Sequence, residues 1–138
     1  MIRILATALL ALSLTASGAF ATSMDDLVER DGVYWKKFTE TPFTGKLDEG
    51  REQGKLKRGK REGPWIYYRE NGQLDAKEEY KNGKKEGPWV TYWPNGRPGA
   101  KGAYKNGKRE GPLIFYYRDG TKNEDISGTY RNDVKVSD

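Results

Sequence analysis

The chain has 138 residues, of which 33% are charged and 35% are hydrophobic, and its formal net charge is +5 at pH 7. It contains no Cys and no His, which excludes disulfide bonds, Cys/His zinc sites and every nucleophile that depends on a Cys or a His. The 25 basic and 20 acidic residues are interspersed, so the sequence predicts a mildly basic surface and no polycationic arm for nucleic acid.

Residues 1–21 have the order of a secretory signal peptide. Arg3 gives a positive start, Ile4–Leu14 is an apolar run, and Ala19-Phe20-Ala21 is an A-x-A cleavage motif. We predict cleavage after Ala21, and hence a periplasmic or secreted protein with no transmembrane segment after cleavage. An uncleaved membrane anchor is the alternative, but the Ser, Thr and Gly residues after Leu14 make a poor spanning helix.

The next region, 22–58, is expected to hold a short helix and a degenerate first repeat. Ser23 can cap a helix over Ser23–Arg30, which Asp31-Gly32 would end. Gly45 would correspond to Gly63 of the first full repeat, which leaves this unit six residues short. We expect its remainder, 46–60, to form a looser hairpin.

Three successive segments, 59–82, 83–106 and 107–132, share one pattern. Glu-Gly-Pro recurs at Glu62, Glu86 and Glu110, 24 residues apart, and the third segment is two residues longer, with the excess in Thr121–Asp125. A period of this size indicates a repeat architecture in which each unit packs on its neighbours. The tail, 133–138, is expected to fray.

Asn-Gly and Asp-Gly pairs divide each repeat into two strands. Such pairs adopt positive φ readily and close tight hairpin turns; they lie at 71–72, 82–83, 95–96, 106–107 and 119–120. The runs between them are rich in aromatic and β-branched residues and are too short for helices. The sequence therefore predicts an all-β fold of tandem stacked β-hairpins, about 24 residues per repeat, with a short N-terminal helix.

Strand alternation separates two faces of the hairpins. One carries Ile66, Val90 and Ile114 followed by Tyr68, Tyr92 and Tyr116, and the other carries Trp65, Trp89 and Leu113. We expect the three tyrosines to be buried and to stabilise the array, which leaves the opposite face as a partly exposed aromatic groove.

The segments Tyr80–Gly87 (YKNGKKEG) and Tyr104–Gly111 (YKNGKREG) resemble MORN repeats. The fuller pattern, Gly-Pro-Trp-x-x-Tyr-x-x-Asn-Gly, is similar to the MORN-repeat-variant family, which is often described as antitoxin-type. The resemblance covers 27–132. It implies a stack of hairpins that binds protein partners or membrane surfaces and carries no catalytic residue.

Equivalent positions of the three repeats supply the candidate partner-binding residues. A basic row runs along the edge of the stack, and two indoles accompany it; the residues are Lys60, Arg61, Lys84, Lys85, Lys108, Arg109, Trp65 and Trp89. Two alternatives stay open: the charges of this edge serve only solubility, and the aromatic residues only form the core. Glu62, Glu86 and Glu110 are interpreted as solvated turn residues paired with nearby Lys and Arg.

The sequence therefore predicts an exported, non-catalytic MORN-like protein that acts as a protein- or envelope-binding scaffold module. The expected partner is an unidentified protein or an anionic envelope surface, without cofactor, metal or nucleic acid. The alternative is an antitoxin- or immunity-like protein that inhibits a toxin by direct binding.

Export is tested directly at the amino terminus. Mass spectrometry of the protein from its native host should find Thr22 as the first residue, because the apolar run and the A-x-A motif together direct cleavage after Ala21. Protein that begins at Met1 and stays in the cytoplasm would contradict this prediction.

Overall fold

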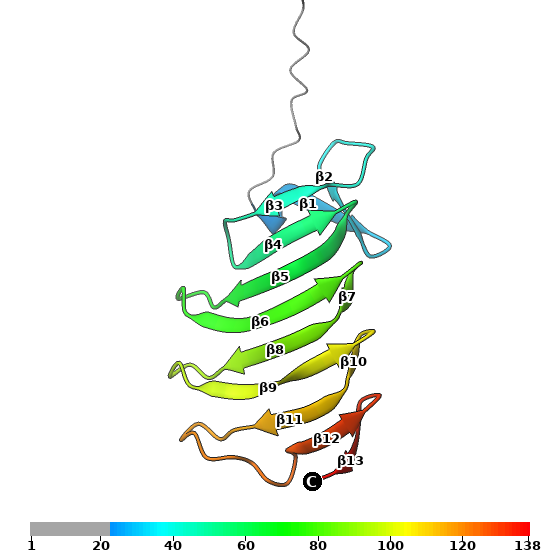
Figure 1. Ribbon diagram of the computed structural model, residues 1–138. Helices are drawn as coiled ribbons and strands as arrows, with labels where there is room; N and C mark the ends of the chain where they lie inside the picture. Colours follow the sequence, from blue (N-terminus) through cyan, green and yellow to red (C-terminus); the bar gives the residue numbers. More distant parts are fainter. Residues whose placement is uncertain (1–22) are drawn as a thin grey trace, which may run out of the picture.

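The computed structural model describes residues 23–138, which form one 3-10 helix and thirteen β-strands (Figure 1). The predicted signal peptide, 1–21, lies outside the described residues. In chain order the elements are η1 (Met24–Asp26), β1 (Leu27–Arg30), β2 (Val33–Lys36), β3 (Gly45–Leu47), β4 (Glu52–Lys57), β5 (Lys60–Tyr68), β6 (Leu74–Lys81), β7 (Lys84–Lys85), β8 (Gly87–Tyr92), β9 (Pro98–Lys105), β10 (Lys108–Arg109), β11 (Gly111–Phe115), β12 (Gly128–Arg131) and β13 (Val134–Ser137).

Strands β3 to β13 form one antiparallel sheet of eleven strands, in which successive hairpins lie side by side (Figure 1). The order is β13-β12-β11-β9-β8-β6-β5-β4-β3, while the short strands β7 and β10 pair with β6 and β9. Strands β1 and β2 form a separate two-stranded sheet. The prediction of an all-β fold of stacked hairpins is confirmed.

The N-terminal helix is much shorter than predicted. Ser23 does cap it, with its hydroxyl accepting the Asp25 N–H, but η1 is a single 3-10 turn. Leu27–Arg30 is strand β1 instead, and Asp31-Gly32 closes the β1–β2 hairpin with φ values of 52° and 74°. Eight residues are too few to stabilise a helix, whereas strand pairing satisfies the backbone and buries Leu27 in the core.

The turns of the sheet are of two kinds. Asn82 and Gly83 both have positive φ, 51° and 83°, as in a two-residue type I′ turn, and Asn106-Gly107 repeats this geometry. At the other ends of the hairpins only the glycine has positive φ, as at Gly72, and the loop is longer. There the Arg69 N–H donates to the Gln73 carbonyl at 2.8 Å. Asn-Gly therefore occurs in turns of both kinds and does not fix the length of a turn.

The core is a column of side chains that repeats once per hairpin. Cross-strand pairing sets Gly45, Gly63, Gly87 and Gly111 opposite Leu56, Tyr80, Tyr104 and Tyr130. Two residues after each glycine come Leu47, Trp65, Trp89 and Leu113, all of them buried. We call the side of the sheet that carries these residues the core face and the opposite side the outer face.

Glycines on the neighbouring strand make room for this column. A Cβ atom on Gly54 would lie 2.5 Å from the Trp65 ring, and one on Gly102 would lie 2.7 Å from Leu113. Both glycines belong to the preceding hairpin, so each repeat packs on the one before it. This contact between repeats replaces the second layer that most sheets need.

The prediction that Tyr68, Tyr92 and Tyr116 form the buried face is wrong. All three are only half-buried, whereas Trp65 is 0% exposed and Leu113 is 1% exposed. The lysine ammonium of Lys101, an outer-face residue, lies 5.8 Å from the Tyr116 ring centroid, which places this ring on the outer side. The glycines that admit large side chains line the core face, and they decide which face is buried.

The degenerate first repeat is a regular but short hairpin. Gly45 pairs with Leu56 as Gly63 pairs with Tyr80, which confirms the correspondence of the two glycines. Strands β3 and β4 are joined over 48–51, whereas β5 and β6 are joined over 69–73, so one of the six missing residues comes from the loop and the others from the arms of the hairpin.

The C-terminal end differs from expectation at the tail. Residues of the predicted insertion form a bridge, Tyr116 with Lys122, and a loop in which the Ser127 N–H donates to the Asn123 carbonyl. The tail does not fray: β13 pairs with β12, with Arg131 opposite Val134. Asn132 and Asp133, with φ values of 48° and 72°, close this last hairpin like the preceding two-residue turns.

The core face generates a stability prediction. Trp89→Ala should lower the free energy of unfolding by about 3–5 kcal/mol because it removes a buried ring between two repeats. Tyr92→Ala, at a half-exposed position of the same strand, should cost about 1 kcal/mol. Urea denaturation followed by circular dichroism measures both values. Equal losses for the two variants would show that the core face has been misassigned.

Candidate functional site

The basic row predicted from the sequence is split by strand alternation. Arg61, Lys85 and Arg109 project to the core face, and Lys60, Lys84 and Lys108 project to the outer face. The first three are half-buried, and Lys84 and Lys108 are exposed. Adjacent basic residues in the sequence thus face different surroundings.

The core-face cations each lie over a tyrosine ring of their own hairpin. Arg61 is 5.5 Å from the Tyr80 centroid, and Lys85 is 5.2 Å from that of Tyr104. Arg109 is 4.9 Å from the Tyr130 centroid. Such contacts stabilise an ordered cation on an aromatic face.

Each of these cations also has a carboxylate partner. Arg61 contacts Glu52 at 2.6 Å, Lys85 contacts Glu78 at 2.6 Å, and Arg109 contacts Asp133 at 3.1 Å. With their charges paired inside the fold, Arg61, Lys85 and Arg109 cover the core column. Their charges are thus less available to a partner than those of the outer-face lysines, and their role in partner binding stays a prediction.

The indoles of Trp65 and Trp89 do not belong to the candidate binding surface. Trp65 is 0% exposed and Trp89 is 8% exposed, so neither ring can be reached by a partner. Their predicted place on a recognition surface is therefore corrected. The alternative, that the aromatic residues only form the core, holds for both indoles.

The first full repeat, 59–82, contains a polar network that the sequence did not indicate. Glu78 stands where the neighbouring repeats have Gly54 and Gly102, and its side chain is 12% exposed. It accepts a hydrogen bond from the Tyr80 hydroxyl at 2.8 Å, and this hydroxyl lies 3.0 Å from that of Tyr67. Burial raises the pKa of Tyr80 far above its usual range, and the hydrogen bonds with Tyr67 and Glu78 raise it further. Tyr80 is therefore neutral, and the network serves the core.

The three glutamates of the Glu-Gly-Pro triplets each hold the turn at the end of their own repeat. The carboxylates of Glu62, Glu86 and Glu110 accept backbone N–H groups of the next two-residue turn, at 2.8, 2.6 and 3.0 Å. The donors are Asn82, Asn106 and Asn132. These glutamates are thus not paired with lysines, as the sequence suggested, but cap the following turn. Within residues 23–138 no group of three or more acidic side chains is placed to hold a metal ion.

The outer face of the same turns carries lysines in opposed pairs. Lys57 lies opposite Lys60, Lys81 opposite Lys84, and Lys105 opposite Lys108. Like charges directly opposite each other destabilise a hairpin. None of the six joins an ion pair in the described part of the chain. We call these six residues the lysine edge.

Sequence reasoning found only half of the lysine edge. Lys57, Lys81 and Lys105 were missed, although Lys-x-Gly-Lys surrounds the turns at 58–59, 82–83 and 106–107 and a two-residue turn sets its flanking residues opposite each other. Between two of these turns lies a cavity of about 280 Å³, lined by Lys81, Asn82, Lys84, Glu86 and Asn106.

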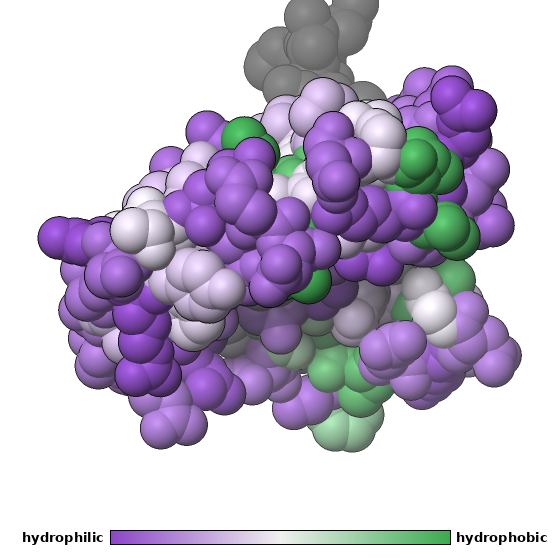
Figure 2. Space-filling view, turned by 90° about the horizontal axis from the view of Figure 1, so that it is seen from below, coloured by the Kyte–Doolittle hydropathy of each residue, from purple (hydrophilic) through white to green (hydrophobic). Residues whose placement is uncertain are grey.

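The rest of the visible surface is mostly hydrophilic, with hydrophobic residues gathered in patches when the stack is seen from the end that carries β13 (Figure 2). Among the described residues, no helix has the length and apolar character that crossing a bilayer requires.

The hairpin geometry defines the class of protein as a β-hairpin repeat array. Residues 61–82, which span β5, its long turn and β6, match the MORN repeat variant family. No curated protein matches the chain. Arrays of this family are generally non-catalytic, and the match indicates a repeat-containing binding or scaffold protein.

The glutamate caps generate a prediction for this region. Glu86→Ala should lower the free energy of unfolding by about 1 kcal/mol, because the Asn106 N–H loses a charged acceptor at a partly exposed site. Glu70→Ala should cost almost nothing, since that side chain is 89% exposed and forms only a surface ion pair. Thermal unfolding measures the loss of stability in each variant. If Glu70→Ala loses as much stability as Glu86→Ala, the capping role of Glu86 is contradicted.

Proposed function

We propose that this protein is an exported, non-catalytic scaffold that attaches to an anionic envelope surface through its lysine edge. The observation that carries the proposal is the opposition of Lys57 and Lys60, Lys81 and Lys84, and Lys105 and Lys108, none of which forms an ion pair in the described part of the chain. Three like-charged pairs reduce the stability of the turns. An anionic partner would remove that repulsion when it binds.

The spacing of the pairs suits a broad, charged surface. Equivalent turns are two strands apart, or about 9.6 Å, which is close to the Debye length of about 8 Å at physiological salt. Their potentials therefore overlap only in part. Each lysine near an anionic bilayer contributes about 1 kcal/mol, so several repeats acting together would give a contact that is weak per residue and sensitive to salt.

Export is the part of the proposal that rests on the sequence alone. The order of charge, apolar run and A-x-A motif in 1–21 supports delivery of the array to the periplasm or beyond. In that compartment the lysine edge would meet the phosphates of envelope lipids, and a scaffold without Cys would not depend on the redox state.

The test is charge reversal at the edge. Lys81, Lys84, Lys105 and Lys108 are changed together to Glu, and co-sedimentation is measured with vesicles that contain phosphatidylglycerol. Retention should fall at least about tenfold, because four favourable contacts become repulsive. The wild-type protein should also lose retention as the salt concentration rises.

A matched control reverses four exposed basic residues near the long turns, namely Arg51, Arg97, Arg118 and Lys122. It makes the same change in net charge but leaves the lysine edge intact. If the control loses vesicle binding as much as the edge variant does, net charge and not the lysine edge is responsible, and the proposal fails.

A further inference from the structure

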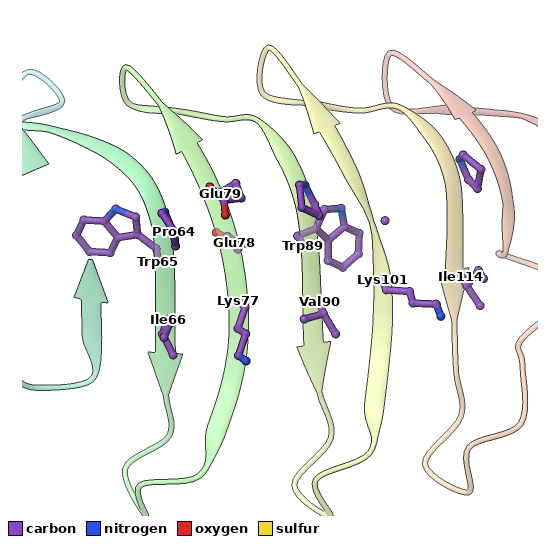
Figure 3. Close-up of a pocket in the computed structure, with 13 residues that line it drawn as sticks. Pro64, Trp65, Ile66, Lys77, Glu78, Glu79, Trp89, Val90, Lys101 and Ile114 are labelled. Carbon is purple, nitrogen blue, oxygen red and sulfur yellow. The ribbon is translucent and has the colours of Figure 1, made fainter. Parts of the chain in front are cut away.

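A second feature of the outer face lies in the middle of the strands, away from the turns. Across five neighbouring strands the directly opposed residues alternate between aliphatic and lysine side chains. The residues are Ile66, Lys77, Val90, Lys101 and Ile114 (Figure 3). We call this set the central row.

The central row borders a wide apolar groove. The groove has a volume of about 740 Å³, and Pro64, Pro88 and Pro112 line it beside the aliphatic residues. The three prolines are exposed, and Ile66 and Val90 are half-buried. The strands of this sheet form a single layer (Figure 1). An apolar sheet face of this kind normally packs against another layer, and a contiguous apolar patch marks an interaction site.

The distances between the aliphatic residues of the central row indicate which secondary structure a bound partner would have. Ile66 and Val90 are two strands apart, or about 9.6 Å, and Ile114 follows at the same interval. Seven residues of an α-helix rise about 10.5 Å, so side chains one heptad apart nearly match successive repeats. In an extended strand, residues on one face recur at about 6.8 Å, which does not match.

The difference between the heptad rise of a helix and the spacing of the repeats stays small over the length of the central row. It accumulates to about 2 Å between Ile66 and Ile114, which flexible side chains can absorb. The prolines and aliphatic residues would contact the apolar stripe of such a helix.

The positive charges of the central row indicate which side chains a bound partner would carry. Lys77 and Lys101 stand between the aliphatic residues, both are exposed, and neither forms an ion pair in the described part of the chain. A partner with carboxylates between its apolar residues would complement both features. We propose that the central row binds an acidic amphipathic α-helix of a protein partner, with apolar residues at heptad spacing and Glu or Asp between them.

This surface is additional to the lysine edge. The edge would hold the array on an anionic surface by charge alone, whereas the central row would hold a helix mainly by apolar contact. A protein that carries both could keep a helical partner at the envelope.

The probe is a synthetic, fluorescein-labelled peptide of about three heptads, with Leu at the apolar positions, Glu beside them and Ala elsewhere. Fluorescence anisotropy at physiological salt should show saturable binding to the full chain. A peptide of the same composition with Leu at every second position has no apolar stripe and should not bind.

Two variants locate the contact. Val90→Glu should weaken peptide binding at least about tenfold, because it places a charge against the apolar stripe. Lys77→Glu combined with Lys101→Glu should weaken it about tenfold as well, and a peptide with Lys in place of Glu should then bind this variant better than it binds the wild type. Rescue by the charge-swapped peptide separates recognition from loss of folding.

The lysine-edge variant with Lys81, Lys84, Lys105 and Lys108 changed to Glu is the matched control. It should keep peptide affinity within about threefold, since its substitutions lie outside the apolar groove. Peptide binding that survives in this variant while vesicle retention is lost supports two separate surfaces.

Three results would overturn the inference. One is absence of peptide binding, and another is equal affinity for the peptide without a stripe. The third comes from sedimentation: if the wild type is a dimer that Val90→Glu converts to monomer, a second copy of this chain covers the face.

Discussion

The stability of this protein depends on one kind of contact, the packing of a large side chain of one hairpin on the last strand of the hairpin before it, where a glycine makes room for Trp65 and for Leu113. Trp65 lies on Gly54, and Leu113 lies on Gly102. A single-layer sheet has no second layer to bury its apolar side, so the core must form between neighbouring repeats. The period of 24 residues is the chain length that returns the next large side chain to the same place in the column.

The other regular interactions keep this stack aligned. On the core face, Arg61, Lys85 and Arg109 cover the tyrosines and pair with carboxylates. At the two-residue turns, Glu62 and Glu86 cap the backbone of the turn that ends their own repeat. These basic residues and glutamates therefore serve the fold. The lysines of the lysine edge and of the central row are left without an ion-pair partner in the described part of the chain.

An array of this kind has extended faces and repeated edges in place of a deep cleft. Among the described residues, Tyr80 has the most strongly raised pKa, and its hydroxyl is held neutral inside the core network. The surfaces proposed to bind partners are those that repeat with the hairpins. The lysine edge and the central row both repeat every two strands, so each would suit a partner whose own features recur at about 10 Å.

The sequence by itself determined the features that depend on local chemistry and spacing. The Asn-Gly turns and the recurrence of Glu-Gly-Pro predicted the all-β repeat. They also predicted the correspondence of Gly45 with Gly63 and the position of the insertion near Thr121. These features follow from the sequence because a turn residue determines the backbone only of its near neighbours. Only the tertiary structure decided which face is buried. Both faces carry aromatic residues, so alternation could separate them but not rank them, and glycines on the neighbouring strand settled the choice. The same long-range packing turned Arg61 inward while leaving Lys60 outside, and it made a strand of Leu27–Arg30, since burial and cross-strand pairing outweigh the helix signal of so short a segment.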